Sequence, residues 1–214
     1  MSQNITTARQ GRRRSASVVL AGAVASAAIA MSFTPTYSAF VASIKNSANT
    51  LGTGTLTMQE TNADGSIVCN STDGGSISTN SATCATINKY GGNMAMVPGQ
   101  TVSTDIKIKN TGTVTATSFT LTPGACTQSN NGAANGTATN LCSKINVVIK
   151  SGSTTIYSGT AAALTNVINF PASLVPVAPG ATVPLTISTT VDSSADSTYQ
   201  GLSASQPLTW TFTS

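Results

Sequence analysis

The chain of 214 residues contains no histidine. Histidine is the usual general base near neutral pH and the commonest metal ligand, so its absence excludes histidine-based catalytic triads and HExxH zinc sites. No stretch of the sequence combines a nucleophile, a general base and oxyanion donors, which a catalytic site needs. We therefore expect no catalytic residues, no metal site and no cofactor, and the composition favours a structural or binding protein over an enzyme.

Charge is also scarce, because only 7% of the residues are Asp, Glu, Lys or Arg. All four arginines precede Ser15, and the rest of the chain holds six lysines against six acidic residues, so its formal charges cancel. A nucleic-acid-binding domain needs a basic patch, and the sequence shows none, so we expect no nucleic-acid partner. Low net charge weakens repulsion between copies and suits a protein that associates.

The N-terminus has the three parts of an export signal: basic residues at Arg9 and Arg12–Arg14, an uncharged small and apolar run over residues 15–31, and small residues near Ser38. The run is shorter and richer in alanine than the about 20 strongly apolar residues of a membrane-spanning helix. We therefore predict that residues 1–38 are a signal peptide whose helix is removed by a signal peptidase. The alternative is a retained N-terminal anchor.

Cleavage after Ser38 places Thr36 and Ser38 at the two positions where the peptidase requires small residues, and it makes Ala39 the first mature residue. Cleavage after Ala39 is the less favourable alternative, because it places the bulky Tyr37 at one of these positions. We expect a secreted protein, located in the extracellular matrix or on the cell surface. We expect no stable membrane association after processing.

Four cysteines remain after cleavage, and an even number in an exported chain indicates disulfides. Three pairings are possible. The sequence-local pairing, Cys69–Cys84 and Cys126–Cys142, would close two short loops rich in Gly, Ser and Asn, and it is the pairing we predict. A zinc site is the rival interpretation, but the sequence has neither a CxxC pair nor a histidine to support it.

Alternation of apolar and polar residues is the main structural signal of the mature chain. It predicts strands over residues 53–61, 102–109, 115–122, 141–150, 154–157, 182–191 and 208–213, shorter strands over 67–68 and 83–87, and a helical turn over 161–164. Roughly eight to ten short strands with one buried face each are typical of an antiparallel β-sandwich. We predict one all-β domain over residues 51–214, with Trp210 in its core.

Asp192 and Asp196 share a short loop rich in Ser and Ala. Their carboxylates could contribute to a calcium site. The simpler interpretation, which we prefer, is a solvated turn at the end of a strand.

Three stretches, taken together, resemble one protein family. The first runs from Ser38-Ala39-Phe40-Val41 to Gly54-Thr55-Leu56, the second from Val97-Pro98-Gly99-Gln100 through Ile106 to Gly112, and the third from Tyr199-Gln200-Gly201 to the terminal strand Leu208–Phe212. They resemble, in the same order, motifs of the TasA/camelysin proteins, which are processed by the SipW type of signal peptidase. The chain departs from the best-known members in its two cysteine pairs and in lacking their long insertions and charged C-terminal extension.

The resemblance implies a jelly-roll-like β-sandwich that is secreted and assembles into extracellular fibres of the biofilm-matrix type. In that family the free N-terminal segment lies as a strand in the neighbouring subunit. By this resemblance residues 39–50 are the candidate donor segment, Ala39 begins it, and Phe40, Val41 and Ile44 are its anchors. The partner would be a second copy of the chain. A disordered or self-packed N-terminus is the alternative.

Two other functions stay open. One is a monomeric surface adhesin or binding module, a role that β-sandwiches often have. The other is a metalloprotease of the camelysin type, against which the absence of histidine argues.

Overall fold

A computed structural model describes residues 44, 46 and 48–214. The predicted signal helix, the cleavage site at Ser38 and Ala39, and the donor residues Ala39, Phe40 and Val41 lie outside the described residues. Residues 52–214 form one compact unit, and the description that follows concerns that unit.

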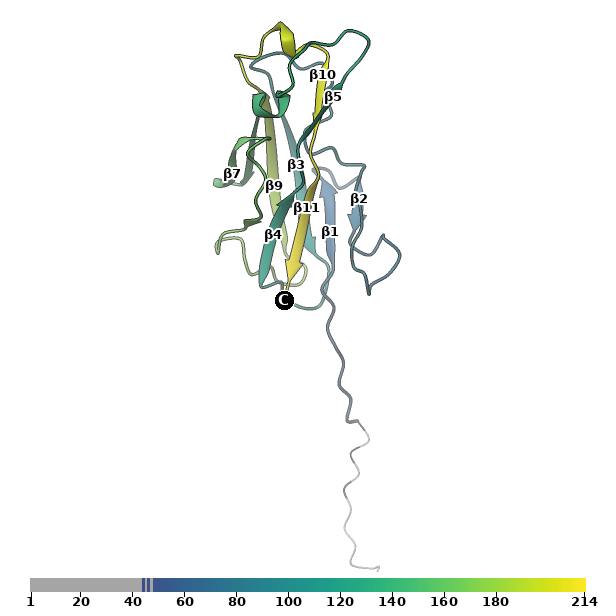
Figure 1. Ribbon diagram of the computed structural model, residues 1–214. Helices are drawn as coiled ribbons and strands as arrows, with labels where there is room; N and C mark the ends of the chain where they lie inside the picture. Colours follow the sequence, from purple (N-terminus) through teal and green to yellow (C-terminus); the bar gives the residue numbers. More distant parts are fainter. Residues whose placement is uncertain (1–43, 45, 47) are drawn as a thin grey trace, which may run out of the picture. The chain divides into compact units, whose positions relative to one another are not determined.

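The regular secondary structure of the unit consists almost entirely of antiparallel strands (Figure 1). Its elements in chain order are β1 (Met58–Asn62), β2 (Val68–Asn70), β3 (Thr101–Asn110), β4 (Ser118–Pro123), β5 (Thr127–Asn130), the 3-10 helix η1 (Leu141–Lys144), β6 (Ile145–Ser151), β7 (Thr154–Thr160), β8 (Ile168–Asn169), β9 (Thr182–Val191), the 3-10 helix η2 (Ser197–Tyr199), β10 (Leu202–Ser205) and β11 (Leu208–Thr213).

The strands form two layers of unequal width. One layer is a six-stranded sheet in the order β2-β1-β3-β9-β6-β7. The other consists of a three-stranded sheet, β11-β4-β8, which continues into the two-stranded ribbon β10-β5 beyond Gly124 and Pro207. The chain repeatedly crosses between the layers, for example from β3 to β4 and from β9 to β10. The predicted jelly-roll-like antiparallel sandwich is therefore confirmed.

Alternation explains which side chains fill the space between the layers. Along β9 the residues at every second position, starting from Val183, are buried, and on β3 Ile106 and Ile108 face the same interior. The narrower layer contributes an aromatic cluster, in which the Phe119 ring stacks on Phe170 at a centroid distance of 3.9 Å and meets Phe212 edge-on at 4.8 Å. Such pairs add stability beyond the area that they bury.

The strands with clear alternation lie close to their predicted positions, whereas others differ. Residues 83–87, predicted as a strand, form no strand. Residues 161–164 form a single turn, in which the Leu164 N–H donates to the Thr160 carbonyl oxygen as it would in one helical turn. Residues 141–144, predicted as the start of a strand, form η1. The strands β5 and β10 were not predicted, because their residues are mostly polar or small and show no apolar alternation.

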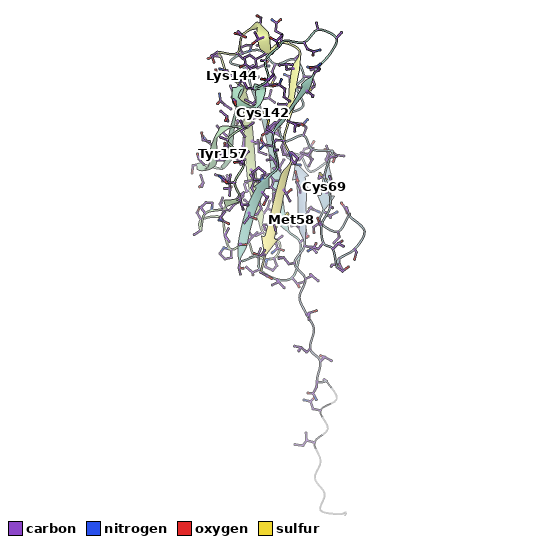
Figure 2. All side chains as sticks on the ribbon, in the orientation of Figure 1. Met58, Cys69, Cys142, Lys144 and Tyr157 are labelled. Atoms are coloured by element: carbon purple, nitrogen blue, oxygen red, sulfur yellow. A yellow bond between two sulfur atoms is a disulfide. The ribbon has the colours of Figure 1, made fainter. Side chains whose placement is uncertain are left out.

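Both disulfides have the predicted sequence-local pairing. Cys69–Cys84 spans 15 positions of the sequence and Cys126–Cys142 spans 16. Figure 2 shows that Cys69 lies beside the β1–β2 edge of the sandwich, near Met58, whereas Cys142 lies near Lys144 at η1. The two bonds therefore fasten different parts of the molecule.

Asp192 and Asp196 cap their own turns. Asp192 Oδ1 accepts hydrogen bonds from the backbone N–H and the hydroxyl of Ser194, and Asp196 Oδ1 accepts the same pair from Thr198. These bonds stabilise the ionised form and lower the pKa of each carboxyl group. Across the described part of the chain, no three His, Cys, Asp or Glu residues gather as a metal site would require. Nor does that part contain a helix long and apolar enough to span a membrane.

Candidate functional site

A groove lies where the wider layer extends past the narrower one. The six-stranded sheet continues through β1 to β2, whereas the opposite layer ends at β11 (Figure 1). The groove has a volume of about 610 Å³, and Met58 and Glu60 of β1 lie on one wall while Leu208–Phe212 of β11 form the other. In the described chain β11 pairs with β4 alone, so the edge of β11 that borders the groove has no strand partner.

An irregular segment, residues 80–90, lies across this groove, and we call it the strap. Its residues 80–85 and 87–89 line the groove, and Ile87 is buried against the core. The segment makes contact mainly through side chains, because no backbone-to-backbone hydrogen bond is formed by any residue from 81 to 87. The strap therefore covers the interior without supplying the main-chain ladder that a strand beside β11 would supply.

Contacts at its middle and near both of its ends fasten the strap to β1 and its neighbours. The Cys69–Cys84 disulfide joins its middle to β2, and the side-chain amide of Asn80 donates to the carbonyl oxygen of Leu56 at 2.5 Å. At the other end Lys89 Nζ lies 2.6 Å from Glu60 Oε1, and the two side chains are only 12% and 9% exposed. The contact is a largely buried ion pair.

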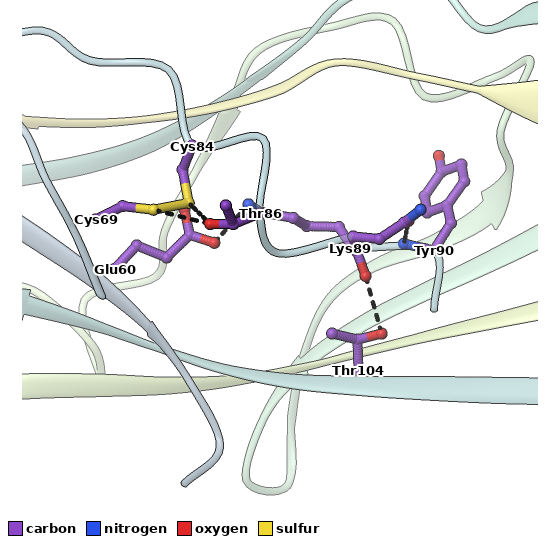
Figure 3. Close-up of polar contacts among 8 residues, drawn as sticks. Glu60, Cys69, Cys84, Thr86, Lys89, Tyr90 and Thr104 are labelled. Atoms are coloured by element: carbon purple, nitrogen blue, oxygen red, sulfur yellow. Dashed lines mark hydrogen bonds and ion pairs between the residues drawn. A yellow bond between two sulfur atoms is a disulfide. The ribbon is translucent and has the colours of Figure 1, made fainter. Parts of the chain in front are cut away.

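Figure 3 shows that the disulfide, Thr86 and the Glu60–Lys89 pair lie next to one another. Glu60 points from β1 into the groove, where an apolar residue would be usual. Burial raises the pKa of its carboxyl group, and the neighbouring Lys89 ammonium offsets part of that effect. Inward-pointing charges discourage wrong strand pairing near a sheet edge.

Trp210 has an unusual position on the opposite wall. Its ring packs on Phe119 and Phe170 and is thus part of the predicted core, but the residue is only partly buried and lines the groove. Its indole Nε1–H is shielded from solvent and has no hydrogen-bond partner in the structure. A buried donor without an acceptor is unfavourable, and a carbonyl oxygen entering the groove would relieve it.

The predicted site residues divide into three groups. Cys69 and Cys84 line the groove, whereas Cys126 and Cys142 lie away from it. Of the three predicted donor anchors only Ile44 lies among the described residues, and its side chain is fully exposed, as is that of Leu51. Sequence reasoning missed Glu60, Lys89 and the groove role of Trp210, because they lie far apart in the sequence and only the strand order brings them together.

No protein-family model matches the chain, and no curated protein sequence matches it either. The functional argument therefore rests on the residues and the geometry of this chain.

Proposed function

We propose that the chain is a secreted structural protein that assembles head to tail into extracellular fibres, with the N-terminal segment of one copy in the groove of the next. The observation that carries this proposal is the groove beside the unpaired edge of β11. An unpaired edge offers a row of N–H and C=O groups to an extended segment, and pockets for alternate side chains give the pairing its specificity.

The predicted donor segment has the pattern that such a groove needs. In an extended strand successive side chains point to opposite faces, so Phe40, Ala42 and Ile44 share one face and Val41, Ser43 and Lys45 the other. Residues 40–45 match in number the six residues of β11. Burying the Phe40 and Ile44 side chains would contribute about 1.5–3 kcal/mol each.

The position of the chain termini favours filaments over closed dimers. Residues 55–57 bond to residues 111–113 at one end of the sandwich, and β11 ends there as well, at the bond from Thr117 N–H to the carbonyl oxygen of Thr213. A copy stacked on the opposite end would deliver its segment antiparallel to β11, the orientation of every strand pair in the sandwich. Donation in one direction leaves a free groove and a free segment at the two ends, so growth continues.

Electron microscopy and size-exclusion chromatography of purified residues 39–214 test the proposal. We expect filaments from this chain and monomers from residues 51–214. Phe40→Ser with Ile44→Ser should abolish filaments, whereas Ser43→Ala, on the other face of the segment, should leave them intact. Monomeric residues 39–214 at high concentration, or filaments that persist without residues 39–50, would refute it.

A further inference from the structure

A second cavity lies between the layers, at the end of the sandwich that carries β5 and β10, and strand donation does not use it. Its volume is about 560 Å³, within the range of small-molecule sites, which are about 300–1,000 Å³. Leu141, Ile145, Val191 and Leu202 line its apolar part. Loop residues 93–96 and Pro98 also line it, as do Asp196, Ser197 and residues 199–201.

Thr189 lines this cavity and carries a buried polar atom that the fold does not explain. It follows Val183, Leu185 and Ile187 on the inner face of β9, and its neighbours on the adjacent strands are Val102 and Val147. The residue is 3% exposed, and its hydroxyl has no hydrogen-bond partner. A valine would have the same shape without an unpaired hydroxyl, so the threonine points to a ligand that supplies the missing partner.

The other polar groups of the cavity are mostly unused and uncharged. Five polar atoms of the lining make no hydrogen bond within the described chain: Asn131 Oδ1, Asn93 Nδ2, both polar atoms of the Gln200 amide, and the Ser197 hydroxyl. The other amide atoms of the two asparagines are used, because Asn131 Nδ2 donates to the Met94 carbonyl oxygen and Asn93 Oδ1 accepts from Ala95 N–H. These groups offer donors and acceptors together. The only charged lining residue is Asp196, whose Oδ2 atom has no donor.

Two tyrosine rings complete the lining. The Tyr90 hydroxyl donates to Gln206 Oε1 at 2.6 Å, and the Tyr199 hydroxyl donates to Asn140 Oδ1 at 2.7 Å, so both rings are held in place by bonds to the protein. A ligand for this cavity must present an apolar surface to the tyrosine rings and the aliphatic side chains. It must also present many hydroxyl groups to the side-chain amides. The cavity has no cationic side chain to hold an anion.

From these features we infer that the cavity binds a neutral oligosaccharide. Sugar rings combine an apolar face with hydroxyl groups that both donate and accept, and they carry no charge. A sugar hydroxyl would accept from or donate to Thr189 Oγ1, and the amides of Asn131 and Gln200 would bond to its neighbours. The inference goes beyond fibre assembly and does not depend on it, because residues 52–214 contain the whole cavity.

The test is isothermal titration of residues 39–214, and of residues 51–214, with cellotriose, maltotriose and mannotriose, with trigalacturonate as an anionic control. We expect at least one neutral trisaccharide to bind both chains saturably and trigalacturonate not to bind. Thr189→Val should weaken binding about tenfold, the effect of one lost hydrogen bond in a desolvated site. Gln200→Ala, a change at an exposed side chain, should weaken it as well.

Thr182→Val is the matched control, because Thr182 lies on the exposed face of β9. It should leave the affinity unchanged. The inference is overturned if none of the three neutral sugars binds at millimolar concentration, or if Thr189→Val binds as tightly as the unchanged chain. Sugar binding by chains that fail to form filaments would separate this inference from the proposed function.

Discussion

Position 189 shows how a single atom can depart from an otherwise regular pattern. The inner face of β9 reads Val183, Leu185, Ile187, Thr189, and only the last carries a polar atom. Because Thr and Val have nearly the same shape, strand propensity does not distinguish them, and the sequence gives no sign that this hydroxyl lacks a partner. The missing partner becomes visible only in the folded sheet, where the neighbouring strands place Val102 and Val147 beside Thr189.

Thr189→Val should therefore stabilise the empty protein. Removing a buried hydroxyl without a partner should raise the free energy of unfolding by about 1 kcal/mol, since such a group costs about 1–3 kcal/mol to bury. Urea unfolding of residues 51–214 measures the change, with Thr182→Val as the exposed control. A loss of stability in Thr189→Val alone would mean that the hydroxyl already has a partner, such as an ordered water.

Glu60 should give the protein a pH dependence with a defined sign. Because burial raises the pKa of its carboxyl group, the folded state binds the proton more tightly than the unfolded state. This contribution to stability is present in acid and is lost as the pH rises from about 4.5 through the raised pKa. The unfolding free energy of the unchanged protein, relative to Glu60→Gln, should thus fall over this range.

Subtracting the Glu60→Gln curve removes the effect of the other acids. Asp64, Asp192 and Asp196 have lowered pKa values because they accept hydrogen bonds from nearby Ser or Thr residues, so they destabilise the fold on acidification. Denaturant midpoints at several pH values measure both proteins. A difference that stays constant across the range would show that the carboxyl group of Glu60 is not desolvated in solution.

At the scale of elements, the sequence was informative where one face of a strand is apolar. β3, β9 and β11 lie at or within one residue of their predicted positions, because buried and exposed residues alternate along them. Residues 83–87 also contain apolar positions, but they face the groove as part of the strap, without a strand to pair with. The groove itself depends on β1 lying opposite the end of the narrower layer, and local alternation does not encode this arrangement.

The strap should act as a barrier to donor entry. It lies over the groove that the donor segment would fill, and the Cys69–Cys84 bond holds its middle to β2. Replacing both cysteines by serine should free the strap and shorten the lag before filaments form, as light scattering would measure. The unfolding free energy should fall by about 3 kcal/mol, the loop-closure value for a link of this span.

Cys126→Ser with Cys142→Ser is the matched control, because that bond spans 16 positions and lies outside the groove. It should cost a similar amount of stability and leave the lag unchanged. If both double variants change the lag equally, the effect follows from lower stability, and the strap is not a barrier.

For the whole molecule, the proposed assembly separates two roles that lie in different parts of the chain. The unit of residues 52–214 contains the complete groove, whereas residues 39–50 supply the donor. The formal charges of residues 39–214 cancel, so copies approach one another without strong repulsion. A chain without residues 39–50 should therefore accept a segment normally but have none to give.

Such a truncated chain should cap growing filaments. Adding residues 51–214 to residues 39–214 at one part in ten should limit filaments to about ten copies, because each truncated chain that joins ends growth in one direction. Electron microscopy measures the length distribution. The Trp210→Asp variant of residues 51–214 places a charge in the groove wall. It should not cap filaments, since it can neither donate a segment nor accept one. If the truncated chain leaves filament length unchanged, or if the Trp210→Asp form shortens filaments equally, the groove beside β11 is not the acceptor.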